Sequence, residues 1–132
     1  GVLARVPLAS GLLTGKYDDA STFAEDDHRN YNRYGAAFDV GETFAGLDYQ
    51  AGLDFVAEVQ ELVPEGATTA QLALRWILMH EGVSAAIPGA KTPEQAQANA
   101  AAADLAPLSD ETMARITELY LDHAKPLVHQ RW

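Results

Sequence analysis

Cysteine is absent from the 132 residues of this chain, which excludes disulfide bonds, thiolate metal sites and cysteine nucleophiles. Basic residues are scarce: 9 Lys and Arg stand against 19 Asp and Glu, for a formal net charge of -10. Such a charge disfavours nonspecific binding to nucleic acid or anionic membranes. No apolar run reaches the roughly 20 residues that a membrane helix needs, and no signal-peptide pattern opens the chain. We therefore expect a cytoplasmic protein that has no nucleic-acid or membrane partner and captures any anionic ligand locally.

Length and composition indicate one domain over residues 1–132. The chain is 48% hydrophobic and 21% charged, values typical of a globular protein with a modest core. It begins with glycine followed at once by strand-like residues. This start suggests a piece of a longer protein, although removal of an initiator methionine before glycine gives the same start.

A strand, a glycine turn and a helix start follow one another in the second half of the chain. Residues 84–87 predict a buried strand that ends at Pro88, and Thr92 predicts the N-cap of the next helix. The first N–H groups of a helix lack partners and carry partial positive charge, which suits a phosphate. Lys91 adds a full charge, and Gly89 lets the backbone approach a ligand closely. An ordinary capped surface helix explains the same residues, so both interpretations stay open here.

A second glycine loop lies near the N-terminus. Residues 2–6 predict a short, largely buried strand, and the loop after it contains Gly11, Gly15 and Lys16. Backbone amides, Ser10 and Lys16 can contact a phosphate there, but a turn with a solvated lysine is equally compatible. The loop is not a Walker P-loop, because the glycine spacing is one residue too short.

The segment 18–48 shows no sustained period and is long for a loop, which is typical of a lid or binding loop. Four of its side chains are expected to pin it to the body or to a cofactor: Arg29, Tyr31, Arg33 and Tyr34. We expect no metal site at residues 26–28, because adjacent side chains rarely converge on one ion.

Helical periods and caps predict the remaining elements. The helices are expected at residues 49–63, 69–81 and 93–103, with a last one after the cap Ser109. The helix over 69–81 is apolar on nearly all sides, which predicts a covered helix with Trp76 and Met79 in the core and a structural role for His80. The tail from residue 125 shows no period, and Trp132 is either a packing plug or an aromatic on the substrate side.

Three motifs carry a family resemblance. Residues 5–17 read RVPLASGLLTGKY, residues 69–76 read TAQLALRW, and residues 87–91 read IPGAK, followed by PEQ at 93–95 and Asn99. In this order they closely resemble the C-terminal part of bacterial-type aldo-keto reductases, over essentially the whole chain. The resemblance implies an α/β fold, the C-terminal part of a (β/α)8 TIM barrel: its last two strands, the long cofactor loop and the closing helices. It also implies an oxidoreductase that transfers hydride between NADPH and a small-molecule carbonyl or alcohol substrate.

The resemblance assigns two halves of an NADP(H) site. The loop after the first strand would hold the pyrophosphate through Pro7, Leu8, Ser10, Gly11, Leu12, Gly15 and Lys16. The loop and helix after the second strand would hold the adenosine 2′-phosphate and adenine through Gly89, Ala90, Lys91, Pro93, Gln95 and Asn99. Lys91 favours NADPH over NADH, because the extra phosphate gains a charged partner. Gln95 replaces an arginine and Ala98 an acidic residue of many relatives, so the adenine grip is weaker or differently built.

No catalytic residue is assigned. The catalytic Asp, Tyr, Lys and His of the resembled family lie on earlier strands, and no residue here occupies those motifs. Histidines, carboxylates and serines are numerous, but no motif brings a nucleophile to a base. We expect the chain alone to lack turnover. The alternative is a non-catalytic helical interaction or nucleotide-binding domain derived from such a reductase.

Overall fold

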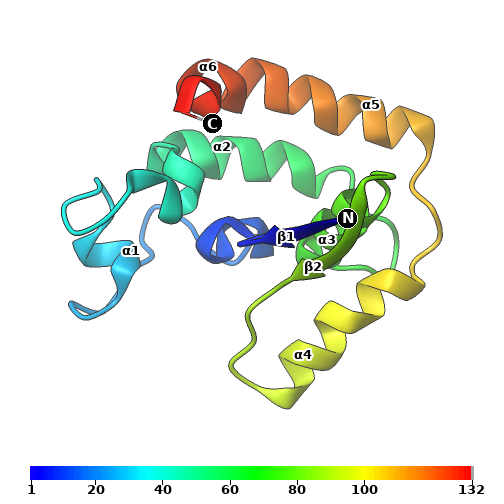
Figure 1. The fold of residues 1–132 in the computed structure, drawn as a ribbon, viewed down its shortest axis with the longest axis horizontal. Helices are drawn as coiled ribbons and strands as arrows, with labels where there is room; N and C mark the ends of the chain where they lie inside the picture. Colours follow the sequence, from blue (N-terminus) through cyan, green and yellow to red (C-terminus); the bar gives the residue numbers. More distant parts are fainter. Residues whose placement is uncertain (132) are drawn as a thin grey trace.

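The computed structural model describes residues 1–131, so the two interpretations of Trp132 lie outside the described residues. The fold is mixed α/β with one small parallel sheet, in which β1 (Val2–Arg5) pairs with β2 (Val83–Ile87). In this register Leu3 lies opposite Ala85, and Arg5 lies opposite Ile87. Parallel neighbours need a long crossover, and here it carries the segment 18–48 and two helices (Figure 1).

Six helices form: α1 (His28–Tyr31), α2 (Tyr49–Gln60), α3 (Thr69–Leu78), α4 (Pro93–Ala100), α5 (Asp110–Leu119) and α6 (Lys125–Val128). Of these, α2, α3, α4 and α5 begin where the capping residues predict, and α1 and α6 were not predicted. Side chains of Asp48, Thr68, Thr92 and Ser109 each accept a hydrogen bond from a backbone N–H of the helix that follows. These four predicted N-caps are confirmed. Because each cap satisfies orphan donors locally, the neighbouring sequence alone was enough to predict it.

The core lies where α2, α3 and α5 meet. Five buried apolar residues form it: Val59, Leu72, Leu108, Ile116 and Leu119. Trp76 packs against this cluster, and no residue of α3 is exposed, which confirms the predicted covered helix. Figure 1 shows α5 and α6 along α2 on one side of the sheet and α4 on the other.

No residue of either strand is fully buried, so the prediction of buried strands is wrong: β1 is mostly exposed, and β2 is only partly buried. Val2 is 53% exposed, Leu3 64% and Ile87 55%. The physical reason is that the described part of the chain builds only two strands and one covering layer, with α3 packed against β2. Small apolar residues predicted a strand correctly but could not say what covers it.

The tail is helical, which corrects the expectation of an aperiodic end. A π-helical turn (Tyr120–Ala124) leads from α5 into α6, and a 3-10 turn (His129–Arg131) follows. Pro126 lies in the first turn of α6, where its missing N–H costs little. The wider π turn lets the chain continue around the proline.

The strap, residues 18–48, runs beyond the carboxyl end of β1 (Figure 1). It contains α1 and two short 3-10 turns, Val40–Glu42 and Phe44–Gly46, and otherwise has no regular structure, as predicted. The buried Asn32 organises it: its Oδ1 accepts hydrogen bonds from the N–H of Ala37 and of Phe38, each at 2.9 Å. Among the helices of residues 1–131, none combines the length and the apolar character that crossing a membrane requires.

Candidate functional site

The loops that follow β1 and β2 meet at one cavity of about 630 Å³. They lie on the same side because carboxyl ends of parallel strands share one edge of a sheet. The start of α3 and two strap residues complete the wall. The lining residues are Val6, Pro7, Leu8, Ser10, Gly11, Thr14, Lys16, Tyr17, His28, Arg29, Thr68, Ala70, Gln71, Gly89, Ala90, Lys91, Gln95, Ala98 and Asn99.

Most residues assigned to the cofactor by resemblance line this cavity. They are Pro7, Leu8, Ser10, Gly11, Lys16, Gly89, Ala90, Lys91, Gln95 and Asn99. Three others lie elsewhere. Leu12 is buried against Phe44 and Val56, Gly15 ends the 3-10 helix Ala9–Thr14, and Pro93 opens α4. The fold thus brings the two predicted loops to one cavity, although Pro7 and Lys91 are 84 positions apart in the sequence.

Backbone strain concentrates in the first loop. Val6, Ala9 and Ser10 have φ values of 48°, 47° and 59°, and Phe44 and Ala45 of the strap have 51° and 55°. Non-glycine residues rarely adopt this left-handed region, and they persist there only where their surroundings hold them.

The hydroxyl of Ser10 joins these two strained segments. It accepts a hydrogen bond from Phe44 N–H at 3.3 Å and donates to the carbonyl of Glu42 at 3.1 Å. At the strand end, Arg5 donates to both carboxylate oxygens of Glu42, at 2.8 and 2.9 Å. The strap and the loop after β1 therefore fix each other's conformation.

Local hydrogen bonds shape the second loop. Gln95 Oε1 accepts from Lys91 N–H at 2.8 Å, and Asn99 Nδ2 donates to the Gly89 carbonyl at 3.2 Å. Gln71 Nε2 donates to the carbonyl of Ala98 at 3.0 Å and ties α4 to α3. The capping interpretation of this turn is thus correct, and the same turn leaves the Lys91 side chain exposed at the cavity.

Arg29 fixes the strap to the body, as predicted. Its Nη1 donates to the hydroxyl of Tyr17 and, at 3.4 Å, to the carbonyl of Ser10, both outside the strap. Within the strap, its Nε donates to Asp27 Oδ1 at 2.8 Å, and its guanidinium lies 4.7 Å from the Phe23 ring centre. These hydrogen bonds from Arg29 hold the pKa of the Asp27 carboxyl far below its usual range.

The other three side chains that were expected to hold the strap, Tyr31, Arg33 and Tyr34, differ in their contacts. Arg33 lies 4.8 Å from the ring centre of Tyr49 and so also contacts the body. Tyr34 is 82% exposed, and Tyr31 is exposed with its ring edge-on to Phe38 of the same strap. Among residues 1–131, neither tyrosine makes a hydrogen bond or a ring contact with the body; the other half of the expectation, a contact with a cofactor, stays a prediction.

Sequence reasoning missed several cavity residues. Tyr17 and His28 were not assigned to the site, and Thr68 and Gln71 were interpreted only as helix caps. The capping box gave no sign of a second role, because it satisfies the helix end by itself. The sequence did offer one indication for His28, because it directly precedes Arg29, which was already expected to hold the strap.

The cavity wall is basic although the chain is strongly acidic. Lys16, His28, Arg29 and Lys91 line it, and none of the lining residues within 1–131 is an aspartate or glutamate. A concave site with one sign of charge concentrates ligands of the opposite sign. The arrangement therefore suits a multiply charged anion.

The cavity shows no assembled acid, base and nucleophile. Ser10 Oγ lies 3.3 Å from His28 Nε2, but its proton is directed to the Glu42 carbonyl. Asp27 Oδ1, 3.6 Å from His28 Nδ1, already accepts from Arg29. In the described part of the chain, no three His, Asp or Glu side chains gather to hold a metal ion.

Comparison with known proteins identifies the family. Residues 1–121 match the model of the Aldo/keto reductase family. The chain belongs to this family. The relatives include a probable voltage-gated potassium channel subunit beta from Arabidopsis thaliana, 33% identical over 99% of this chain and 36% of that protein. An L-glyceraldehyde 3-phosphate reductase from Escherichia coli O157:H7 is 33% identical over 92% of this chain and 34% of the relative.

A solved aldo/keto reductase structure has a similar fold. The glycerol dehydrogenase from Gluconobacter oxydans superposes with a TM-score of 0.71 at 26% identity and covers 93% of this chain. This chain covers 35% of that structure. It therefore spans about a third of the length of these relatives, in structure as in sequence.

Proposed function

We propose that the cavity binds NADPH and that the chain is the cofactor-binding part of an oxidoreductase. The observation that carries this proposal is the meeting of two glycine loops at one basic wall free of carboxylates among residues 1–131. Lys16 and the loop after β1 would hold the pyrophosphate, and Lys91 the 2′-phosphate. When bound, NADPH would supply a hydride to an aldehyde or ketone, and in the reverse direction NADP+ would accept a hydride from an alcohol.

We also propose that β1 and β2 are the last two strands of a (β/α)8 barrel. Exposed apolar side chains at Val2, Leu3 and Ile87 support this placement, because a closed barrel buries both faces of each strand. The length of the relatives supports it too. The catalytic Asp, Tyr, Lys and His would then come from other strands, and the chain alone would have no turnover. A reducing cytoplasm suits this cysteine-free chain.

Cofactor choice tests the proposal through Lys91. We would titrate the 132-residue chain with NADPH and with NADH and follow nucleotide fluorescence. Lys91→Ala should weaken NADPH binding about tenfold, because a charge-assisted contact is lost, and should change NADH binding much less.

Lys125→Ala is the matched control, because Lys125 is an exposed lysine on α6 that does not line the cavity. This variant should bind both nucleotides as the parent chain does. If Lys91→Ala weakens the binding of NADPH and NADH equally, the assignment of Lys91 to the 2′-phosphate is contradicted. Absence of NADPH binding, with a cooperative and monodisperse fold, would favour the non-catalytic interaction domain. Carbonyl reduction by the chain alone would contradict the expected absence of turnover.

A further inference from the structure

His28 is the histidine among the residues that line the cavity, and imidazole is the side chain type that can gain or lose a charge between about pH 5 and 8. It opens α1 in the strap and lines the cavity beside Ser10, so it comes from a different segment than either glycine loop. Its ring is partly exposed, with 38% of the side chain accessible. Solvent and a ligand can therefore both reach it.

Both ring nitrogens of His28 face oxygen atoms. Because the Ser10 hydroxyl donates to the Glu42 carbonyl and accepts from Phe44 N–H, its remaining lone pair suits a donor at His28 Nε2, 3.3 Å away. On the other side, His28 Nδ1 lies 3.6 Å from the acceptor Asp27 Oδ1. A hydrogen on Nε2 fits the Ser10 oxygen, and the charged ring would carry a second hydrogen on Nδ1, on the side of the Asp27 carboxylate.

The charged groups around His28 are otherwise balanced. Asp27 is paired with Arg29, and Glu42 of the strap is paired with Arg5 at the end of β1. Hydrogen bonds from Arg29 and from Arg5 lower the pKa values of Asp27 and Glu42, and His28 contributes to both shifts in the same direction. Two carboxylates and two guanidiniums sum to zero, so a proton on His28 adds one positive charge to the wall.

We propose that His28 is a proton-dependent anion contact of this cavity, which tightens the binding of phosphate groups as the pH falls. The inference rests on the proposed function, since the phosphates are those of the nucleotide held by the loop after β1. Ser10 links the two directly, because its hydroxyl contacts His28 and its backbone belongs to that loop. His28 thereby gives the strap a charge that appears only when the imidazole is protonated.

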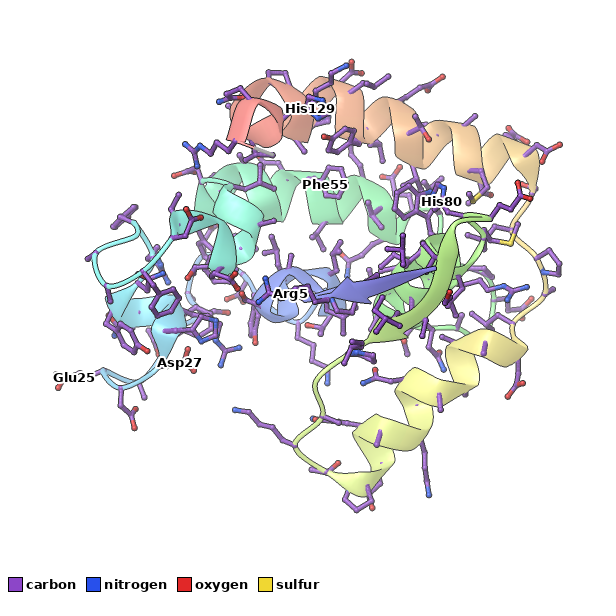
Figure 2. All side chains as sticks on the ribbon, in the orientation of Figure 1. Arg5, Glu25, Asp27, Phe55, His80 and His129 are labelled. Atoms are coloured by element: carbon purple, nitrogen blue, oxygen red, sulfur yellow. The ribbon has the colours of Figure 1, made fainter. Side chains whose placement is uncertain are left out.

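The experiment compares the parent chain with His28→Gln and with the control His80→Gln. His80 is exposed at the end of α3, far from Asp27 and the strap (Figure 2). The dissociation constants of NADPH, by fluorescence, and of inorganic pyrophosphate, by calorimetry, are measured at about pH 6 and about pH 8. Titration of the ligand's own phosphates is common to all three proteins and cancels in the comparison.

We expect both ligands to bind the parent chain and His80→Gln more tightly at the lower pH. The ratio of the dissociation constant at the higher pH to that at the lower pH should be roughly fivefold larger in these two proteins than in His28→Gln. If His28→Gln does not fold, the nuclear magnetic resonance signal of the His28 ring in the parent chain replaces it. That signal should move toward the protonated position when pyrophosphate is added near neutral pH.

Each other outcome decides between the two proposals. Identical pH dependence in all three proteins, or an unmoved His28 signal, overturns the role of His28 and leaves NADPH binding intact. If pyrophosphate binds in a way that depends on His28 but NADPH does not bind, the role of His28 as an anion contact stands and the proposal that the cavity binds NADPH is overturned. Failure of both ligands to bind overturns both.

Discussion

Replacing Ser10 tests whether its hydroxyl holds the strained loop after β1. Ser10→Ala removes the partner of Phe44 N–H and the donor to the Glu42 carbonyl, two partly buried groups. At about 1 kcal/mol for each lost hydrogen bond, the expected loss of unfolding free energy is about 2 kcal/mol. Alanine also keeps the left-handed strain of this position, where φ is 59°.

Ser10→Gly separates the two effects. Glycine loses the same hydrogen bonds but adopts positive φ without steric cost, which returns about 1 kcal/mol. The predicted order of stability is therefore the parent chain, then Ser10→Gly, then Ser10→Ala. Ser84→Ala is the control, because Ser84 is exposed in β2 and does not line the cavity; its stability should change by less than about 0.5 kcal/mol.

Urea unfolding followed by tryptophan fluorescence measures these differences. With a slope of about 1–2 kcal/mol per molar urea, a loss of about 2 kcal/mol lowers the midpoint by about 1–2 M. A Ser10→Ala chain as stable as the parent would show that the hydroxyl does not hold the two segments together. A Ser10→Gly chain no more stable than Ser10→Ala would show that positive φ carries no strain here.

Two further substitutions probe the anchoring of the same region. Asp27→Asn should lower stability at neutral pH by about 1–2 kcal/mol, because it breaks the pair with Arg29. The pKa of Asp27 is lower in the folded chain than in the unfolded chain. Its contribution to the free energy of unfolding is therefore present above the ordinary carboxyl range, near pH 4, and is lost as the pH falls further. Below this range, the stability of the variant should fall less steeply with pH than that of the parent chain. Gly52→Ala should destabilise α2 by about 1 kcal/mol, because its Cβ would lie 2.6 Å from the buried Leu12. Gly82→Ala, with nothing within 4 Å of the new Cβ, should be neutral in the same urea experiment.

Local signals in the sequence predicted the starts of α2, α3, α4 and α5 and both glycine loops, because caps and turns depend on neighbouring residues. The strap was beyond such reasoning. Its form depends on the buried amide of Asn32 and on the hydroxyl of Ser10, which contacts residues more than thirty positions away. A hydroxyl or amide in a polar loop looks the same in sequence whether it is solvated or buried. The exposure of Leu3 was missed for the same reason, since an apolar run does not reveal its neighbours.

The two walls of the cavity are held by different means, and this difference bears on how a nucleotide would bind. The wall after β1 is joined to the core, because Leu12 packs under Val56 and Phe44, and Ser10 fixes the strained strap. The wall after β2 is mostly exposed and is shaped by short-range contacts such as that of Gln95 with Lys91 N–H, with the Gln71 hydrogen bond to the Ala98 carbonyl as its tie to α3. Local stability follows burial and long-range contacts, so the first wall is preformed and the second can adapt. A pyrophosphate would therefore meet a fixed loop, while the adenosine end would meet the loop that carries Lys91 and can adjust around it.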